Sequence, residues 1–397
     1  MKQDSTMTDL INLEFRPEIC DLCESNEFRI LIDLRGRVMT SDRKISNGRI
    51  KKIQCIKCGL VRNGIPIKKS QLKQEYKKKY TYNTSKNGDN FFFTTSGHQE
   101  RSMQIFEWMT SFVGNSYLSK IKTIVEMGCG QGNLLAKFAQ HFPDKKIIGL
   151  ELNEEAIRIG RKKGLDIRHY ENAHDIRADM VISYAVIEHT PSPKNFIQQL
   201  NSMLNPNGII VIGQPHQDIL NYDIFFTDHL YHFSTNHIQE LGRISNLIQV
   251  KKSTKAWPID SFSLHLFRKS NERITQKTKY YKTKVMESIK YYNRIFDKVN
   301  TFLRKNKSTN MAVFGLGEIF SIFCTYSDLG ETKISYGIDD FPKNKKEFPF
   351  PVISSNEVKN HNIDTILLCV NPKYYKILLK RLQPSNYNIL FPFEKKP

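Results

Sequence analysis

The pattern of apolar and polar positions predicts a central region in which strands and helices alternate. Five short apolar runs have the length and composition of buried strands, and helical periodicity lies between them. These runs cover residues 122–127, 146–151, 165–170, 179–186 and 208–213. Such alternation is typical of a doubly wound parallel α/β sheet. Two later runs, 247–254 and 261–267, predict an antiparallel edge.

Two helices and a second α/β pattern flank this region. Gly97–Val113 reads as a helix that leads into the sheet, and Arg273–Lys305 reads as one long basic helix. Six apolar residues recur at helical spacing in the long helix and predict one buried face: Val285, Ile289, Tyr292, Phe296, Val299 and Leu303. Strands at 311–314, 333–338 and 365–370 then predict a smaller sheet.

These shifts in pattern predict four regions. They are an N-terminal domain at 1–95, a cofactor-binding domain at 96–270, a connecting helix at 271–306 and a Rossmann-like C-terminal domain at 307–397. A chain of 397 residues is long enough to give each larger region its own core.

The net charge of +20 is concentrated in two segments of the chain. Arg43–Lys79 holds 13 basic residues against one acid, and Arg273–Lys305 holds 10 against two, so these segments account for the whole excess. One interpretation is contact with an anion, either nucleic acid or the diphosphate of an activated substrate. The other is a solvated, lysine-rich surface.

No early apolar segment resembles a signal peptide, and no apolar run approaches the ~20 residues of a membrane helix. We therefore expect a soluble, cytoplasmic protein without a membrane span.

A glycine loop follows the first strand of the central region. The loop reads Glu126-Met-Gly128-Cys-Gly130-Gln-Gly132, and an amphipathic helix follows it. Alternate glycines permit a tight turn and close approach of a ligand to the backbone. The spacing differs from the G-x-G-x-x-G of dinucleotide sites. An acid beside exposed N–H groups suits the ammonium and carboxylate of S-adenosylmethionine.

A second acid, Glu151, ends the next strand and is followed by Leu152. It lies 19 residues after Gly132, where a carboxylate can accept hydrogen bonds from both ribose hydroxyls. We expect Glu126, the three glycines, Glu151 and Leu152 to bind S-adenosylmethionine. The alternative is a glycine turn in another kind of α/β protein.

Two C-x-x-C pairs, Cys20/Cys23 and Cys55/Cys58, precede this region. Without a secretory signal, two such pairs predict a four-thiolate zinc site rather than disulfides. Four protein ligands leave no open position, so the zinc would be structural. A redox pair is the alternative.

Loops at the carboxyl ends of parallel strands converge on one edge. Three histidines, His189, His229 and His232, are thereby expected near the glycine loop. Histidine accepts a proton near neutral pH, which methyl transfer to a hydroxyl or an acidified carbon requires. Structural histidines are the alternative.

The C-terminal region carries Gly315-Leu-Gly317, with Phe320 in place of the third fingerprint glycine. Asp339 lies 22 residues beyond Gly317. Nicotinamide binding and a Rossmann-like fold without a ligand therefore both stay open.

Taken together, these motifs resemble the sugar C-methyltransferase family. The resemblance covers about residues 17–395 and rests on the double C-x-x-C, Glu-x-Gly-x-Gly-x-Gly, Ala185-Val-Ile-Glu-His189, Asp228-His-Leu-Tyr-His-Phe-Ser234 and Tyr336-Gly-Ile-Asp-Asp340. It implies a zinc-binding N-terminal domain, a class I S-adenosylmethionine-dependent methyltransferase domain and a C-terminal Rossmann-like domain. It also implies a nucleotide-linked keto sugar as substrate, with a base that removes a proton beside the ketone.

The family's Tyr-His-Glu-His segment maps to Phe226-Thr-Asp228-His229, which keeps the base as His229, shortens the acid to Asp228 and lacks the phenol. A second family tyrosine maps either to Tyr82 or within Phe91–Ser96, where there is no phenol. Since phenols are donors to a developing oxyanion, O-methylation competes with C-methylation. The catalytic candidates are His229, Asp228, His189 and Tyr82.

Two further hypotheses stay open. The basic charge and the cysteine pairs favour an RNA or protein methyltransferase, although the chain lacks an aromatic RNA-binding signature. A zinc-containing scaffold that binds S-adenosylmethionine without turnover is the non-enzymatic alternative.

Overall fold

The computed structural model describes residues 15–74, 89, 91–94, 97–172, 175–254, 261–270, 279–340, 348–382 and 387–393. The chain forms two compact units. The first comprises Met1–Asp33, Lys51–Ile224 and Asp228–Val285, and the second comprises Leu34–Ile50, Phe225–Thr227 and Met286–Pro397.

A seven-stranded sheet forms the centre of the first unit. Its strands are β6 (Thr123–Met127), β7 (Lys146–Glu151), β8 (Ile167–His169), β9 (Ala178–Tyr184), β10 (Leu204–Pro215), β12 (Leu247–Ser253) and β13 (Phe262–Lys269). Their order is β12-β13-β10-β9-β6-β7-β8, and β13 runs antiparallel to both of its neighbours. The predicted strands and the antiparallel edge are confirmed. The strand order reverses between β6 and β9, the switch point where open α/β sheets bind ligands.

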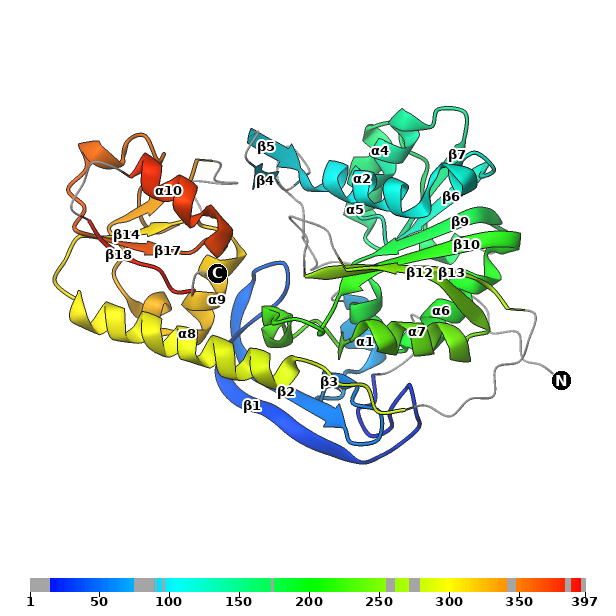
Figure 1. Cartoon of the computed structure of the whole chain (residues 1–397), viewed down its shortest axis with the longest axis horizontal. Coiled ribbons are helices and arrows are strands. Elements are labelled where there is room, and N and C mark those ends of the chain that lie inside the picture. Colours follow the sequence, from blue (N-terminus) through cyan, green and yellow to red (C-terminus); the bar gives the residue numbers. More distant parts are fainter. Residues whose placement is uncertain are drawn as a thin grey trace. The chain divides into compact units, whose positions relative to one another are not determined.

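Helices cover both faces of this sheet (Figure 1). On one face lie α2 (Arg101–Val113), α4 (Asn133–His141) and α5 (Glu154–Lys162), and on the other lie α6 (Pro193–Ser202) and α7 (Thr235–Ile244). Alternate strand residues serve the two faces, as the pleat requires. Ile124 and Met180 pack in the cluster that contains Phe106 of α2, whereas Val125 and Val181 pack in the cluster that contains Phe196 of α6.

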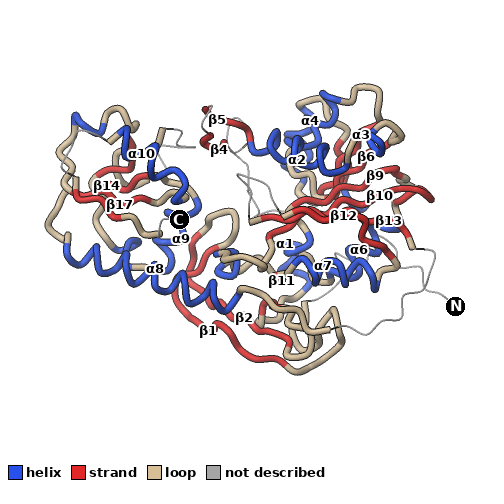
Figure 2. Tube along the Cα trace, in the orientation of Figure 1, coloured by secondary structure: helices blue, strands red, loops and turns tan. Residues whose placement is uncertain are grey.

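The N-terminal region of the chain contributes strands of a smaller sheet and one short helix. Strands β1 (Phe28–Met39), β2 (Ile45–Cys55), β3 (Val61–Asn63) and β11 (Tyr231–His232) pair in that order, and α1 (Lys69–Gln74) follows. Figure 2 shows β1 and β2 as a long hairpin. Strand β11 comes from the region after β10, so residues far apart in sequence complete one sheet.

The predicted helix Gly97–Val113 is wrong at its start. Gly97–Glu100 forms β5, which pairs with β4 (Phe91–Thr94), and α2 begins at Arg101. Cross-strand hydrogen bonds take the backbone groups that a longer helix would have used. A four-residue helix, α3 (Asn115–Leu118), follows α2.

A five-stranded parallel sheet forms the second unit. Its strands β14 (Met311–Phe314), β15 (Tyr336–Ile338), β16 (Val352–Ile353), β17 (Thr365–Leu368) and β18 (Asn388–Leu390) have the order β16-β15-β14-β17-β18. Helices α8 (Val285–Lys305), α9 (Glu318–Tyr326) and α10 (Tyr375–Arg381) accompany it. This is the predicted Rossmann-like arrangement.

The long basic helix begins later than the sequence predicts. Within the described residues, Lys279–Lys284 are not helical and α8 starts at Val285. Its predicted apolar face is confirmed, because all six of the named residues are buried. None of the described helices has the length and apolarity needed to cross a membrane.

Candidate active site

The glycine loop turns the chain from β6 into α4. Gly128, Gly130 and Gly132 have φ values of 74°, 54° and 76°, in the left-handed region that favours glycine. A Cβ on Gly128 would lie 2.5 Å from Val186 Cγ2, and one on Gly132 would lie 2.5 Å from Leu165 Cδ1. A Cβ on Gly130 would meet no described atom within 4 Å. Gly128 and Gly132 therefore permit packing, and Gly130 faces space that a ligand can use.

Glu151 and Leu152 lie directly against this loop. The Glu151 carboxylate accepts hydrogen bonds from the backbone N–H groups of Gly130 at 2.8 Å, Leu152 at 2.6 Å and Asn153 at 2.9 Å. These bonds fix the acid at the end of β7. The structure thus brings together the residues predicted to hold the ribose.

Glu126 is the second acid at this edge. Its side chain is 5% exposed, and one carboxylate oxygen has no hydrogen-bond partner among the described residues. Burial, with help from the charge of Glu151, raises the pKa of Glu126 to about 8. A cation beside it would stabilise the ionised form. The ammonium group of S-adenosylmethionine fits this orphaned oxygen.

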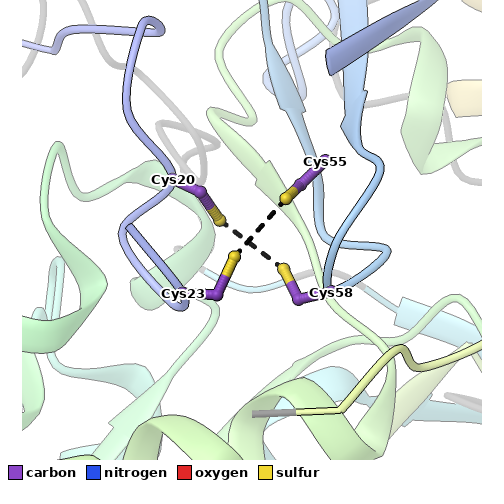
Figure 3. A group of neighbouring side chains, drawn as sticks. All are labelled: Cys20, Cys23, Cys55 and Cys58. Atoms are coloured by element: carbon purple, nitrogen blue, oxygen red, sulfur yellow. Dashed lines mark hydrogen bonds between the residues drawn. The ribbon is translucent and has the colours of Figure 1, made fainter. Parts of the chain in front are cut away.

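The four predicted zinc ligands converge on one point, as Figure 3 shows. The sulfur atoms of Cys20 and Cys58 are 3.5 Å apart, as are those of Cys23 and Cys55, and all four lie within 4.8 Å of one another. A disulfide would bring two sulfurs to about 2.0 Å. Tetrahedral Zn–S bonds of about 2.3 Å place sulfurs about 3.8 Å apart. The separations therefore fit a metal better than a disulfide.

Each C-x-x-C pair closes a tight turn. Glu24 N–H donates to the Cys20 carbonyl at 2.8 Å, and Gly59 N–H donates to the Cys55 carbonyl at 2.9 Å. Glu24 and Gly59 have φ values of 59° and 82°. A Cβ on Gly59 would also lie 2.3 Å from the carbonyl oxygen of Tyr281, so a larger residue does not fit there.

The predicted histidines surround an acid that the sequence did not single out. Asp223, in the 3-10 turn Tyr222–Phe225, accepts a hydrogen bond from His229 Nδ1 through one carboxylate oxygen. Its other oxygen lies 2.5 Å from His232 Nδ1 and 2.9 Å from Gln217 Nε2. All four side chains are buried. The hydrogen bond at Nδ1 directs the chemistry of His229 to its Nε2 atom.

The two histidines on Asp223 titrate in opposite directions. Burial alone would lower the pKa of His229, but the charge of Asp223 and its hydrogen bond outweigh burial and raise that pKa to about 9. Burial lowers the pKa of His232 to about 4, and the charge of Lys52 acts in the same direction. His229 is therefore the histidine that holds a proton at neutral pH.

His189 and Asp228 form a second pair beside the first. The rings of His189 and His229 meet edge to face with centroids 4.6 Å apart. His189 Nδ1 lies 3.1 Å from the Asp228 carbonyl oxygen and 3.7 Å from its carboxylate. Burial lowers the pKa of His189 to about 4.

Glu188 completes this buried group. Burial raises its pKa to about 7, although His229 acts against the rise. Donor atoms of Glu188, His189 and His229 lie within 4.8 Å of one another, a spacing at which carboxylate and imidazole groups can bind a divalent cation. The ammonium of Lys52 acts on Asp223 and Asp228 in the same cluster and disfavours a second buried cation.

Sequence reasoning placed the glycine loop, the acids and the histidines at one sheet edge and the four cysteines in one metal site, but it missed Asp223 and Lys52. Asp223 precedes His229 by six residues, a separation without a helical or strand relationship. Lys52 lies in β2 two residues from both Ile50 and Gln54, so it shares their face of the strand, and the structure buries both of these residues. The candidate Tyr82 lies outside the described residues.

Comparison with known proteins agrees with a methyltransferase fold in the central region. A family model described as "Methyltransferase domain" matches residues 98–271. Trans-aconitate 2-methyltransferase of Azoarcus sp. (strain BH72) is 26% identical over 113 residues, which cover 27% of this chain and 42% of that protein. A probable S-adenosylmethionine-dependent methyltransferase of Mycolicibacterium smegmatis is 29% identical over 105 residues, 24% of this chain and 39% of that protein.

The chain thus spans less than half the length of the curated relatives it matches. A solved structure of the plantazolicin methyltransferase BpumL with SAH has 16% identity, covers 43% of this chain and 85% of that chain, and has a TM-score of 0.35. The central region has the fold of a class I S-adenosylmethionine-dependent methyltransferase, as the sequence predicts.

Proposed function

We propose that this protein transfers a methyl group from S-adenosylmethionine to a carbohydrate, a nucleotide-linked keto sugar, with His229 as the general base. The observation that carries the proposal is the Asp223–His229 pair beside the carboxyl edge of the sheet that bears the glycine loop. Leu230 N–H donates to the Glu188 carbonyl at 2.8 Å and so ties this segment to the loop after β9.

The cofactor would rest on the glycine loop. Gly130 leaves room at the backbone, Glu151 and Leu152 would hold the ribose, and Glu126 would pair with the ammonium group. When bound, S-adenosylmethionine supplies an electrophilic methyl group. The residues of the loop bind and orient it, and the proton chemistry belongs to the histidine cluster.

His229 would take the proton that the acceptor loses. A neutral imidazole is needed for this step, and Asp223 makes it a stronger base by stabilising the imidazolium that forms. The proton stays on His229 Nε2 while Asp223 holds Nδ1. The same roles serve removal of a proton from a carbon beside a ketone or from a hydroxyl.

The sugar class is supported by the order of parts along the chain. A four-cysteine cluster precedes the methyltransferase fold, and a parallel Rossmann-like sheet follows it, as the family resemblance implies. Within this proposal the cysteines hold a structural zinc ion. The proposal also keeps the domain boundaries predicted from the sequence, at residues 95, 270 and 306. It includes a cytoplasmic location for the protein.

O-methylation is the second candidate. Phe226 stands where the family has a phenol, and it is 3% exposed. The curated relatives named above include a trans-aconitate 2-methyltransferase. A small acceptor with a hydroxyl group would need the same base but no donor for an enolate, whereas an acceptor carboxylate is already ionised at neutral pH and would need no base.

Mass spectrometry can test the proposal. The purified protein is incubated with S-adenosylmethionine and a panel of nucleotide keto sugars, nucleotide sugars without a ketone, and trans-aconitate. We expect a gain of one methyl group only with a keto sugar, together with deuterium exchange at the carbon beside its ketone. Methylation without such exchange supports an oxygen acceptor. Absence of turnover with every sugar, with turnover of trans-aconitate, overturns the carbohydrate proposal.

A further inference from the structure

Tyr231 is held by both halves of the four-cysteine cluster. Its side chain is buried. Its backbone lies in β11, which pairs with β3 just after the second C-x-x-C pair, with Arg62 opposite Tyr231. Its hydroxyl donates a hydrogen bond to Asp21, which lies within the first C-x-x-C pair. The two halves of the cluster therefore contact one residue through different groups.

Asp21 also has a second partner in the other half of the cluster. Its Oδ2 atom accepts from the Tyr231 hydroxyl and, at 2.9 Å, from Arg62 Nη1. Arg62 is 0% exposed, and its guanidinium lies 4.7 Å from the centre of the Phe28 ring. A buried guanidinium is costly without a carboxylate, so the Arg62–Asp21 pair has a reason of its own. That reason does not involve the hydroxyl of Tyr231, which calls for another.

Tyr231 and its neighbour His232 face in opposite directions, because successive strand residues alternate between the two faces. The Tyr231 side chain reaches Asp21, whereas His232 Nδ1 lies 2.5 Å from a carboxylate oxygen of Asp223. The other oxygen of Asp223 accepts from His229. A shift of Tyr231 would therefore move both histidines relative to the acid that they share.

The hydroxyl of Tyr231 also meets the loop after β9. It lies 3.2 Å from the carbonyl oxygen of Pro191. The same loop carries Glu188, whose carbonyl accepts from Leu230 N–H at 2.8 Å, and His189, whose ring meets that of His229. The first C-x-x-C turn, the loop after β9 and the histidine segment thus come together at one phenol.

We propose that Tyr231 and Asp21 are positioning residues, and that their hydrogen bond holds His229 and His232 where Asp223 can contact both rings. The inference rests on the proposed role of His229 as the base. Tyr231 acts through the backbone of β11 and not on the acceptor. A metal ion bound by the four cysteines would join the two halves that hold Tyr231, so the cluster would order the active site as well as stabilise the fold.

The competing explanation is that this hydrogen bond only adds stability. Backbone carbonyls of the histidine segment have other donors, since Asn63 N–H donates to Leu230 at 2.8 Å and Lys52 Nζ donates to His229 at 2.8 Å. If these suffice, loss of the phenol would lower stability and leave the Asp223–His229 hydrogen bond unchanged in the folded protein. The Nδ1 proton of His229 reports this bond in NMR spectra, so no acceptor or turnover is needed to decide.

The test compares full-length wild type and Tyr231→Phe, both labelled with ¹⁵N-histidine. The variant keeps the ring, which stacks on Phe233, and leaves Arg62 paired with Asp21. In the wild type we expect a downfield Nδ1 proton signal of His229 that exchanges slowly with water, as for a buried hydrogen bond to a carboxylate. In the variant this signal should broaden or move upfield. With a nucleotide sugar that the wild type methylates, kcat should fall about tenfold or more, while the Kd for S-adenosylmethionine stays within about twofold.

Tyr281→Phe is the matched control. The Tyr281 hydroxyl lies 3.4 Å from a carboxylate oxygen of Glu240, and the Tyr281 backbone N–H donates to the Cys58 carbonyl at 3.0 Å. This variant removes a phenol beside the second C-x-x-C pair without changing Asp21 or its partners. It should leave the His229 signal and kcat as they are in the wild type.

Three results overturn the inference. The first is a wild-type protein whose His229 Nδ1 proton exchanges freely with water. The second is a folded Tyr231→Phe protein whose His229 signal matches the wild type. The third is an equal change in Tyr281→Phe, which would trace the effect to general loosening of the cysteine region. If Tyr231→Phe does not fold, Asp21→Ala, which removes the acceptor and leaves the phenol, gives the same comparison. Absence of methyl transfer with every acceptor would leave the NMR comparison intact and would count against the proposed function alone.

Discussion

At the scale of single residues, the hydrogen bond between Asp223 and His229 sets the pH dependence of the proposed reaction. His229 must be neutral to accept a proton, and its pKa is raised from 6.5 to about 9. We therefore expect kcat/KM of the wild type to rise with pH up to about 9. In Asp223→Asn the rise should end well below pH 9, because burial then acts without the opposing charge of Asp223, and the plateau should be about 10²-fold lower, because the imidazole loses its orientation.

Asp218→Asn is a suitable control for this experiment. Asp218 accepts from Thr235 N–H at 3.1 Å and lies 3.7 Å from His216. Its profile should match that of the wild type. A profile of Asp223→Asn that still rises to pH 9 would assign the base to another group.

The raised pKa of Glu126 predicts how the free energy of unfolding depends on pH. The folded protein holds a proton on Glu126 up to a pKa of about 8, whereas the unfolded chain releases it near 4.5, so the free energy of unfolding should decline between those pH values. Glu126→Gln cannot ionise. We expect the apo variant to be close to the wild type at pH 5 and to exceed it by on the order of 4–5 kcal/mol at pH 8.5, as measured by denaturant unfolding.

The same variant should bind S-adenosylmethionine at least tenfold more weakly by calorimetry, because the ammonium loses its partner. A variant less stable than the wild type at pH 8.5 would show that the buried carboxylate has a compensating partner.

Local sequence patterns sufficed to find Glu126, since an acid at a strand end before glycines is visible in the sequence. They could not find Asp223, because its relation to His229 exists only in the folded turn.

At the scale of elements, the glycines of the loop have different roles: Gly130 leaves room for the cofactor, and Gly132 allows close packing. Gly130 and Gly132 share a left-handed φ, but only Gly132 has a neighbour, Leu165, within 2.5 Å of an added Cβ. Gly130→Ala should lose about 1 kcal/mol of stability from backbone strain and most of its affinity for S-adenosylmethionine. Gly132→Ala should lose roughly 2–4 kcal/mol of stability. Thermal unfolding and calorimetry on both variants check this, and equal loss of affinity at equal stability would contradict it.

The cysteine cluster predicts one zinc ion per chain. The turns at Glu24 and Gly59 hold the four sulfurs at spacings that fit a metal ion, and β2 ends at Cys55. Cys55→Ser should therefore lower the unfolding temperature by about 5 °C or more and abolish zinc by elemental analysis. Cys324→Ser, which alters a partly buried cysteine of the second unit, should retain both. A wild-type protein that lacks zinc but keeps four free thiols would contradict the prediction.

Strands and buried faces were predictable from the sequence because apolar periodicity records burial directly. The residues at which helices and strands begin were harder to predict. Gly97–Glu100 has no apolar pattern of its own and becomes a strand only because Phe91–Thr94 pairs with it. The pairing of Tyr231–His232 with Val61–Arg62 is also invisible, since it joins segments some 170 residues apart.

At the scale of the whole molecule, the chain passes repeatedly between the two units. The short segment Phe225–Thr227 belongs to the second unit, yet in sequence it separates Asp223 from Asp228. Phe225 is 2% exposed, and its ring contacts those of Tyr326, Phe296 and Tyr292 at 5.2, 5.5 and 6.1 Å. Phe225 is therefore anchored within the hydrophobic packing of the second unit.

Loss of that anchor should affect catalysis more than cofactor binding. Phe225→Ala removes a buried ring and should cost about 3–5 kcal/mol of stability in the second unit. Asp223 precedes Phe225 in the sequence and His229 follows it, so a displaced Phe225 should disturb the hydrogen bond between them. We therefore expect kcat to fall at least tenfold, while the Kd for S-adenosylmethionine stays within twofold. Phe320→Ala is the matched control, since Phe320 packs against Phe348 and Phe350 in the same unit. It should lower stability with little change in kcat, and an equal fall of kcat in both variants would trace the loss to general destabilisation of the second unit.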